Sequence, residues 1–524
     1  MSLALDDDAA SHGVEAWEAA AAGVLRKAHR LADDAPDHDV WSTLARTTLD
    51  GIDVTPLGTS ALVADLPQPV RPTRAGAWDI RARAGDGQQA QAELTGGATS
   101  LWLQGPPETV LADVLLDIAP VVLADPSAAT ELLAMGELHP HTNLGHPAEE
   151  ADEAQADRAR GAGVLGFVAD ASAAHRDGAS DAQELAWGCW LGAAYLRRVG
   201  DPALLEFRYA ATDDQFATIA KLRAARVLWA RMLELSSIAD VAQRQHAVTS
   251  TMMTSRYDRH VNLLRTTVAG FAAGVGGADS VTVLPFENST LGRRMARNVS
   301  HLLIEESHLA VVADAAGGSF LVERLTHDLA EAAWAELARI EQDGTDAFDA
   351  RVAATAAERA GRVARRSQPI TGLSEFPSAD EGALSGEPAG YGAAFEALRD
   401  RPVEQPVFLA TMGPLASHTA RAGFATNLLA AGGLTVVSAG PTDGVEDVLA
   451  AYDGQAVVML AGADPTYAAW GAELVGALRE AGAQWVVVAG KPGLPNGQSL
   501  GVDDAARVGT DAVAFLTTVR EKLS

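Results

Sequence analysis

The sequence offers almost no cysteine chemistry. Its 524 residues contain one cysteine, Cys189. A single cysteine excludes an internal disulfide and any zinc site built from cysteines, and this scarcity is typical of proteins in a reducing compartment. Because Cys189 lies among tryptophan and leucine residues in a predicted helix, we expect an inert core residue in a cytoplasmic protein.

Positive charge is also scarce. Lysine and arginine together number 40 against 69 acidic residues, which gives a formal net charge of −29. Nucleic-acid phosphates and anionic membrane surfaces both require a cationic protein face, so the composition argues against both partners. No run of about eighteen apolar residues occurs, and the acidic start of the chain has no apolar core, so neither a membrane span nor a signal peptide is expected.

The chain does have a high hydrophobic content, 48%, spread over more residues than one core usually supports. We therefore expect at least two domains. Strands alternate with helices through the first two thirds, which suits a (β/α)8 TIM-type barrel, predicted over residues 41–368 behind an N-terminal helical arm, 1–40. Three of the strands are expected at 78–82, 100–103 and 120–123.

One αβ unit stands out in the middle of the chain. Asp258 is a candidate helix cap, Gly276 and Gly277 form a helix stop, and the β-branched run 280–284 is typical of a buried strand. The helix between cap and stop is expected to bury five apolar residues that recur at helical spacing: Val261, Leu264, Val268, Phe271 and Val275.

Three further helices are predicted from the same spacing. One runs from 215 to about 234 and begins with a capping box, in which Thr212 and Gln215 satisfy free backbone donors reciprocally. A second runs from 326 to about 342. The arm helix is expected to place these residues on one face: Val14, Trp17, Ala21, Val24, Leu25 and Ala28.

A change of composition separates a second domain from the barrel. Residues 369–404 are rich in proline, glycine and serine with little periodicity, which is typical of a linker. Strands and helices alternate again over 405–524. This pattern predicts a doubly wound, flavodoxin-like domain.

Several motifs give the chain a specific resemblance. The runs HAVTS, NLLRTT, AARVLWA, ARN, EESH and AGGSFLVERLT resemble the barrel motifs of the methylmalonyl-CoA mutase family, and the last 120 or so residues resemble its cobalamin-binding domain. The resemblance covers most of the chain and implies a barrel followed by a cobalamin-binding-type domain. The region 135–185 is short for that family, which leaves open the loss of a barrel strand or of loop segments.

The cobalamin motif of the family is absent. In its catalytic members D-x-H-x-x-G follows the first strand of the second domain, and the Asp orients the His that ligates cobalt. The aligned positions here hold Leu415, Ser417 and Ala420. A shift by one residue brings in His418 without its orienting carboxylate, so we expect a solvent-side or N-terminal helix residue, and a cobalt ligand is the alternative. The serine turn before Leu460, which receives the nucleotide tail in the family, is also replaced, by Val458 and Met459.

The substrate-binding residues of the family are only partly retained. His246 aligns with the catalytic His beside the substrate carbonyl, and a hydrogen-bonded structural His is the alternative. The family's R-P-W-T-I-R-Q-Y-A-G segment keeps Trp78 and Arg81, but Ala82 and Arg83 replace its Gln and Tyr. Because radical chemistry needs every group positioned in a sealed pocket, we interpret His246, Arg81 and Trp78 as remnants and expect no catalytic residue.

Two further clusters have structural explanations. His139, His141 and His146 lack accompanying carboxylates or cysteines at ligand spacing, so we expect loop residues and no metal. Arg293, Arg294 and Arg297 are expected to form salt bridges along one helix, and contact with a CoA phosphate is the alternative.

Two functional hypotheses remain open. The first is a small, non-catalytic subunit of a heterodimeric, adenosylcobalamin-dependent methylmalonyl-CoA mutase, whose large subunit binds cobalamin and substrate. In that case no cofactor is expected on this chain. The second is an active acyl-CoA mutase or a CoA-thioester-binding protein with a modified site. The missing D-x-H-x-x-G favours the first, because a cobalt ligand and its supporting residue are hard to replace.

Overall fold

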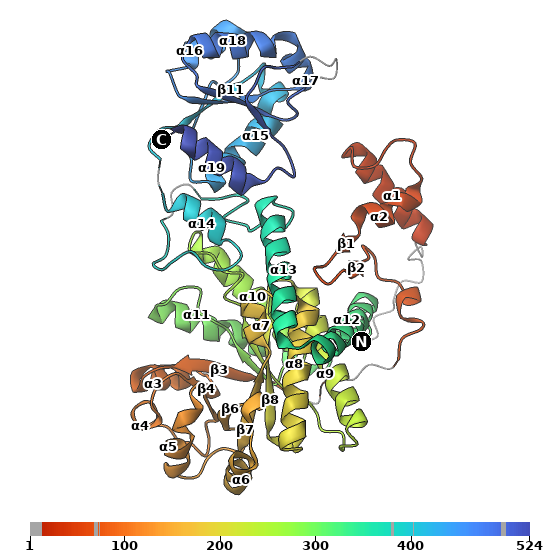
Figure 1. The fold of residues 1–524 in the computed structure, drawn as a ribbon, viewed down its shortest axis with the longest axis vertical. Helices are drawn as coiled ribbons and strands as arrows, with labels where there is room; N and C mark the ends of the chain where they lie inside the picture. Colours follow the sequence, from red (N-terminus) through yellow and green to blue (C-terminus); the bar gives the residue numbers. More distant parts are fainter. Residues whose placement is uncertain are drawn as a thin grey trace, which may run out of the picture.

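A computed structural model describes residues 13–67, 72, 74–378, 382–401, 403–493 and 499–523. Its main feature is a closed barrel of eight parallel strands in the order β10-β3-β4-β5-β6-β7-β8-β9 (Figure 1), which confirms the expected barrel. The region 135–185 keeps two strands, so its shortness removes no strand. The eight strands are β3 (Asp79–Ala84), β4 (Ser100–Leu103), β5 (Val121–Leu123), β6 (Asn143–Pro147), β7 (Leu165–Asp170), β8 (Leu205–Ala211), β9 (Arg244–Thr249) and β10 (Ser280–Thr282).

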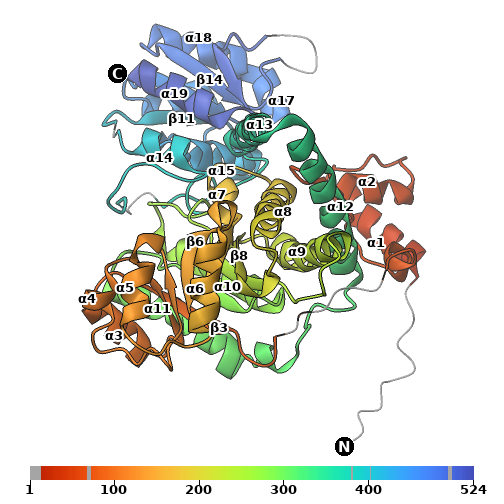
Figure 2. The same ribbon diagram turned by 60° about the horizontal axis from the view of Figure 1, so that its bottom comes forward.

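Helices surround the barrel, and a further helix covers part of that ring. α12 (Phe320–Asp343) lies outside α8 and α9 (Figure 2). The inner ring consists of α3 (Gly87–Thr95), α4 (Pro107–Val110), α5 (Ala129–Ala134), α6 (Glu153–Ala162), α7 (Ser172–Arg176), α8 (Asp181–Arg198), α9 (Gln215–Leu235), α10 (Arg259–Val275) and α11 (Thr290–His301).

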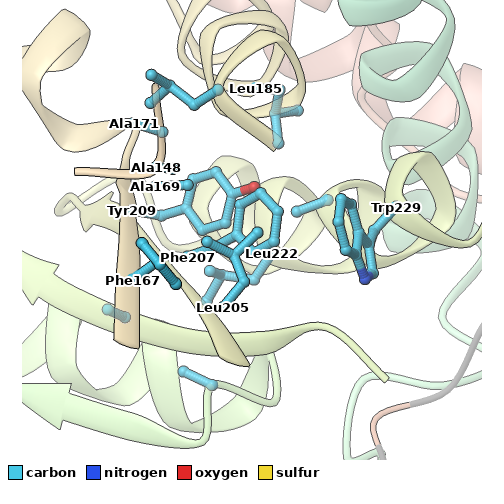
Figure 3. Close-up of a cluster of buried hydrophobic side chains, with 14 of the residues drawn as sticks. Ala148, Phe167, Ala169, Ala171, Leu185, Leu205, Phe207, Tyr209, Leu222 and Trp229 are labelled. Carbon is cyan, nitrogen blue, oxygen red and sulfur yellow. The ribbon is translucent and has the colours of Figure 1, made fainter. Parts of the chain in front are cut away.

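The largest core lies between the barrel wall and the surrounding helices, and Figure 3 shows the part beside α8 and α9. Phe207 and Tyr209 of β8 point outward into it, and the ring of Phe207 meets that of Trp229 on α9 edge to face at 4.8 Å. Because successive side chains of a strand point to opposite faces, the alternate residues Glu206 and Arg208 point into the barrel. The alternating side chains of β8 thus contribute apolar groups to the core outside the barrel and charged groups to the barrel interior.

Two local predictions were wrong. α9 begins at Gln215 with Asp214 as its cap, whose side chain accepts from the backbone N–H of Ala217, so Thr212 and Gln215 form no capping box. On α10 the barrel-facing side is small and polar, and Leu264 is 65% exposed. The cause is close packing: a Cβ on Gly274 would lie 2.6 Å from the Trp78 ring, which leaves no room for large side chains on that face.

The N-terminal region forms a small unit with its own core. α1 (Val14–Lys27) and α2 (Val40–Leu44) stand beside the barrel in both views (Figures 1 and 2). The rings of Trp17 and Trp41 lie 4.7 Å apart, and Ala22 and Leu25 are buried. The predicted helix is confirmed; on its predicted face Leu25 is buried and Val24 is 66% exposed. A two-stranded ribbon, β1 (Arg46–Thr47) and β2 (Asp53–Val54), follows.

The segment after the barrel is more ordered than its composition predicts. α13 (Thr345–Ala364) precedes it and α14 (Ala393–Arg399) lies within it. Glu396 of α14 accepts from the Arg256 side chain at 2.9 Å, and Asp400 pairs with the same guanidinium. The loop after β9 therefore holds this segment against the barrel.

The C-terminal sheet is a second, separate parallel sheet with strand order β12-β11-β13-β14-β15. α15 and α19 pack on one face, and α16 and α18 pack on the other. No helix of the described ranges is long and apolar enough to cross a membrane. The elements are β11 (Val407–Thr411), α15 (Leu415–Ala431), β12 (Val436–Ser438), α16 (Val445–Ala451), β13 (Val457–Ala461), α17 (Asp464–Thr466), α18 (Ala472–Glu480), β14 (Trp485–Ala489), β15 (Asp504–Ala506) and α19 (Ala512–Leu523).

Candidate functional site

His246 lies inside the barrel on β9 and is fully buried. The Nε–H of Arg208 donates to its Nδ1 at 3.3 Å, so Nε2 carries the ring proton and donates to Thr282 Oγ1 at 2.8 Å. Burial and the charges of Arg81, Arg208 and Arg83 hold the pKa of His246 well below its ordinary value. His246 is therefore a neutral imidazole whose two nitrogens both have protein partners.

Arg81 also points into the barrel, where a carboxylate neutralises it. Its Nη1 donates to Glu206 Oε1 at 2.8 Å, and its Nε donates to Ser100 Oγ at 3.2 Å. Burial alone lowers the pKa of Arg81, but the charges of Glu206 and Asp79 outweigh burial and raise it. Because both members of the Arg81–Glu206 pair are buried, removing Arg81 would leave the Glu206 carboxylate without its ion-pair partner in the interior, whereas Arg81 also pairs with Asp79 at 3.4 Å.

Trp102 of β4 fills the space above His246. The guanidinium of Arg83 lies 4.3 Å from the Trp102 ring centre, that of Arg208 lies 4.2 Å from it, and the His246 ring meets it edge to face at 5.5 Å. Trp102 also packs with Val122, Val248 and Leu284 in an apolar cluster. Side chains of this chain thus occupy the part of the interior around His246.

Trp78, the third predicted remnant, lies elsewhere. Its ring packs outside the barrel wall against Gly274 of α10, and its indole N–H donates to Ser300 of α11 at 3.3 Å. The structure therefore brings His246 and Arg81 together inside the barrel and separates Trp78 from them. Trp78 fixes two outer helices to the wall.

A recess of about 320 Å³ lies beside the barrel wall, between β3, β10, α3 and α11. Two of the predicted arginines line it. Arg297 pairs with Glu93 of α3, and Arg293 lies 3.8 Å from the same carboxylate. The salt bridges predicted for this cluster exist, but their partner lies on a neighbouring helix rather than on α11 itself.

A second buried polar cluster lies near the carboxyl ends of β7 and β9. The Oγ of Ser250 lies 2.7 Å from His175 Nε2, and Lys221 pairs with Glu184 at 2.6 Å. Burial and the charge of Lys221 lower the pKa of His175 to about 3. The hydroxyl of Tyr391, from the segment after the barrel, lies 3.4 Å from the same His175 nitrogen and covers the cluster.

His418 lies in the first turns of α15, which agrees with the predicted N-terminal helix position, but its side chain is buried and does not face solvent. Its Nδ1 donates to the carbonyl of Gly413 at 3.0 Å, where a supporting carboxylate is expected for a cobalt ligand. Leu415 and Ala420 of the replaced motif are exposed on the same helix, and Ser417 is half-buried. The imidazole is thus held by a backbone carbonyl.

The residues at this edge of the C-terminal sheet do not fit a cobalamin. Met412, Leu460 and Tyr467 are buried together in the apolar core that covers one face of the sheet. The hydroxyl of Tyr467 accepts from the Gly462 N–H at 2.9 Å and lies 3.0 Å from the Ala489 carbonyl. The large side chain of Tyr467 therefore joins the ends of β13 and β14.

The remaining candidates show no site. The rings of His139 and His141 meet edge to face at 5.1 Å, whereas His146 packs near Phe167. Among the residues that the structure describes, no group of three or more His, Cys, Asp or Glu side chains is arranged to hold a metal. Cys189 is buried, and burial raises the pKa of its thiol to about 12, which confirms an unreactive core residue.

Sequence reasoning missed most residues that surround His246. Trp102, Glu206 and Arg208 are spread over two strands far apart in the chain. A local signal did exist on β8, where Glu206 and Arg208 alternate with aromatic residues in an otherwise apolar run. Such alternation in a barrel strand indicates a polar interior.

The chain resembles known proteins over its whole length. The family model described as Methylmalonyl-CoA mutase matches residues 168–389. The chain is 39% identical to the methylmalonyl-CoA mutase small subunit of Streptomyces virginiae, over 100% of this chain and 98% of that protein. It is 32% identical to the small subunit of Propionibacterium freudenreichii subsp. shermanii, over 94% of this chain and 90% of that protein.

A more distant relative has a different name. The chain is 32% identical to the methylmalonyl-CoA mutase large subunit of Streptomyces virginiae, over 38% of this chain and 30% of that protein. The similarity to that protein is therefore partial, whereas the similarity to the small subunits extends along the chain.

Proposed function

Because the chain belongs to the methylmalonyl-CoA mutase family, we propose that it is the small, non-catalytic subunit of an adenosylcobalamin-dependent methylmalonyl-CoA mutase. Its partner is the large subunit, which binds cobalamin and substrate and interconverts methylmalonyl-CoA and succinyl-CoA. Both chains form a heterodimer in the cytoplasm. The small chain contributes a folded surface that stabilises the large one.

One observation carries this proposal: the region of the barrel around His246 is filled from within. Trp102 lies between two guanidinium groups, and both nitrogens of His246 are bound by protein side chains. A substrate carbonyl would have to displace Thr282 to reach the His246 proton. We therefore propose that His246, Arg81 and Trp78 have structural roles only.

The C-terminal sheet supports the same proposal. Its order β12-β11-β13-β14-β15 is the 2-1-3-4-5 order of flavodoxin-like domains. We infer a flavodoxin-like, cobalamin-binding-type domain over 405–524 that has lost its ligand, behind a linker over 369–404, a barrel over 41–368 and an arm over 1–40. Ser417 occupies the position of the cobalt-ligating His, and the neighbouring His418 has a backbone carbonyl as its partner and no supporting carboxylate.

The alternative is an active acyl-CoA mutase or a CoA-thioester binder. The retained pair His246 and Arg81 is the feature that favours it. The names of the relatives that cover most of the chain favour the small-subunit function instead.

Two measurements on purified protein test the proposal. Co-expression with the large subunit is expected to give a one-to-one complex, which size-exclusion chromatography with light scattering measures. Titration of the isolated chain with adenosylcobalamin is expected to leave the cobalamin absorbance spectrum unchanged. A chain that stays monomeric beside the large subunit, or a saturable spectral change, would contradict the proposal.

A further inference from the structure

An apolar groove of about 710 Å³ lies where the barrel region meets the C-terminal sheet. It is formed by the end of α13, the start of the following segment, the second half of α15 and the loop before α19. In Figure 1 the upper end of α13 reaches this boundary. Its lining includes Arg365, Arg366, Glu375, Phe376, Phe424, Asn427 and Val508.

Two apolar side chains of this groove are strongly exposed. Phe376 is 77% exposed and Val508 is 89% exposed, and both line the same groove as the half-buried ring of Phe424. Single exposed apolar residues are common, but here an aromatic and an aliphatic side chain line one concave surface. Aromatic residues in such positions are typical of the residues that dominate protein–protein binding.

Phe376 is also held in an unfavourable backbone conformation. Its φ angle is +52°, in the left-handed region that a bulky residue rarely adopts. The side chain of Asn427 maintains this geometry, because its Oδ1 accepts from the Phe376 N–H at 2.7 Å while its Nδ2 donates to Glu375. Since the exposed ring gains little from packing, the strain points to a role outside the isolated chain.

The groove carries positive charge in a strongly acidic protein. Arg366 lies over the Phe424 ring at 5.1 Å and pairs with Glu375 at 3.3 Å, and burial lowers its pKa. Arg365 is exposed, and no carboxylate lies within ion-pair distance of it in the part of the chain that the structure describes. The groove is therefore complementary to a partner surface that presents an apolar side chain with a carboxylate next to it.

We propose that this groove is a docking site for the large subunit, which inserts an apolar side chain beside Phe376 and sets a carboxylate against Arg365. The inference rests on the proposed function. The net charge of −29 on each copy of this chain opposes self-association, which favours a different chain over a second copy as the occupant.

The test compares the affinity of the large subunit for the wild-type chain and for Phe376→Gly, by titration in isothermal calorimetry. Glycine accepts the positive φ and keeps the Asn427 hydrogen bond, so the thermal unfolding midpoint of the isolated variant should stay equal or rise. The dissociation constant should increase at least tenfold. A matched control is Val311→Ser, because Val311 is 80% exposed but lies outside the groove.

The charged part of the groove has its own variant. Arg365→Glu should weaken the complex and reduce the dependence of its affinity on salt concentration.

Wild-type affinity in Phe376→Gly, or an equal loss of affinity in Val311→Ser, would overturn the groove as a docking site and leave the proposed function intact. If the wild-type chain itself fails to bind the large subunit, both proposals fail. If Phe376→Gly instead disrupts a homodimer, the occupant is a second copy and the proposal is wrong.

Discussion

Two buried histidines, His246 and His175, show how this chain uses groups that elsewhere serve catalysis. In both, burial and neighbouring cations lower the pKa and keep the ring neutral. Each ring is then held by hydroxyl groups, Thr282 for His246 and Ser250 for His175. Both nitrogens of His246 are hydrogen-bonded, so its neutral imidazole stabilises the fold but has no free nitrogen for a substrate.

The His175 environment predicts a specific loss of stability in acid. The pKa of His175 is about 3 in the folded state and 6.5 in the unfolded state. The contribution of the neutral His175 ring to the unfolding free energy is therefore present above pH 6.5 and is lost as the pH falls toward 3. Between pH 7 and pH 5.5 the wild-type chain should therefore lose about 1 kcal/mol more unfolding free energy than His175→Gln. Urea unfolding at the two pH values measures this difference.

The matched control is His29→Gln, since the side chain of His29 is exposed. This variant should show the same loss between pH 7 and pH 5.5 as the wild-type chain. An unchanged pH dependence in His175→Gln would mean that His175 is not held neutral in the folded state.

At the scale of elements, close packing explains why α10 differs from its sequence prediction. The sequence places its large apolar residues on one stripe, which predicts a buried face there. Trp78 instead meets α10 at Gly274, so the small residues face the wall and Leu264 faces outward. Periodicity identifies a helix, but the neighbour that sets its orientation lies almost two hundred residues away.

This contact predicts opposite effects of alanine in two barrel helices. Gly274→Ala places a Cβ 2.6 Å from the Trp78 ring and should lower the unfolding free energy by about 1–3 kcal/mol. Gly161→Ala in α6 is the matched control, because its Cβ meets nothing within 4 Å and helix propensity should raise the unfolding free energy by about 0.5–1 kcal/mol. Equal effects in urea unfolding would contradict the packing argument.

The helix caps show the limits of local signals in the same way. The residues Thr212 to Gln215 fit a capping box in sequence, yet Asp214 lies closer to the helix start and caps it. True capping boxes occur at Ser180 and Asp152. A motif of four residues predicts that a helix begins, but competition among neighbouring polar side chains decides where.

At the scale of the whole molecule, alternation of strands and helices was enough to predict the barrel and the second sheet. β15 gives no strand signal in the sequence, because it is three residues long and begins with a charged residue. Loss of the cobalamin motif was readable at Leu415, Ser417 and Ala420, since that motif is local. The sequence could not predict that Trp102 fills the barrel interior, because this packing depends on side chains from several strands.

The most direct test of the non-catalytic function is turnover of methylmalonyl-CoA by the reconstituted complex. The large subunit is combined with this chain carrying His246→Gln and His418→Ala, and its kcat/KM is compared with that of the wild-type complex at equal amounts of heterodimer. We expect values within about twofold, since neither residue contacts substrate or cobalt in this account. A loss of a hundredfold or more in an intact heterodimer would show that this chain takes part in the chemistry.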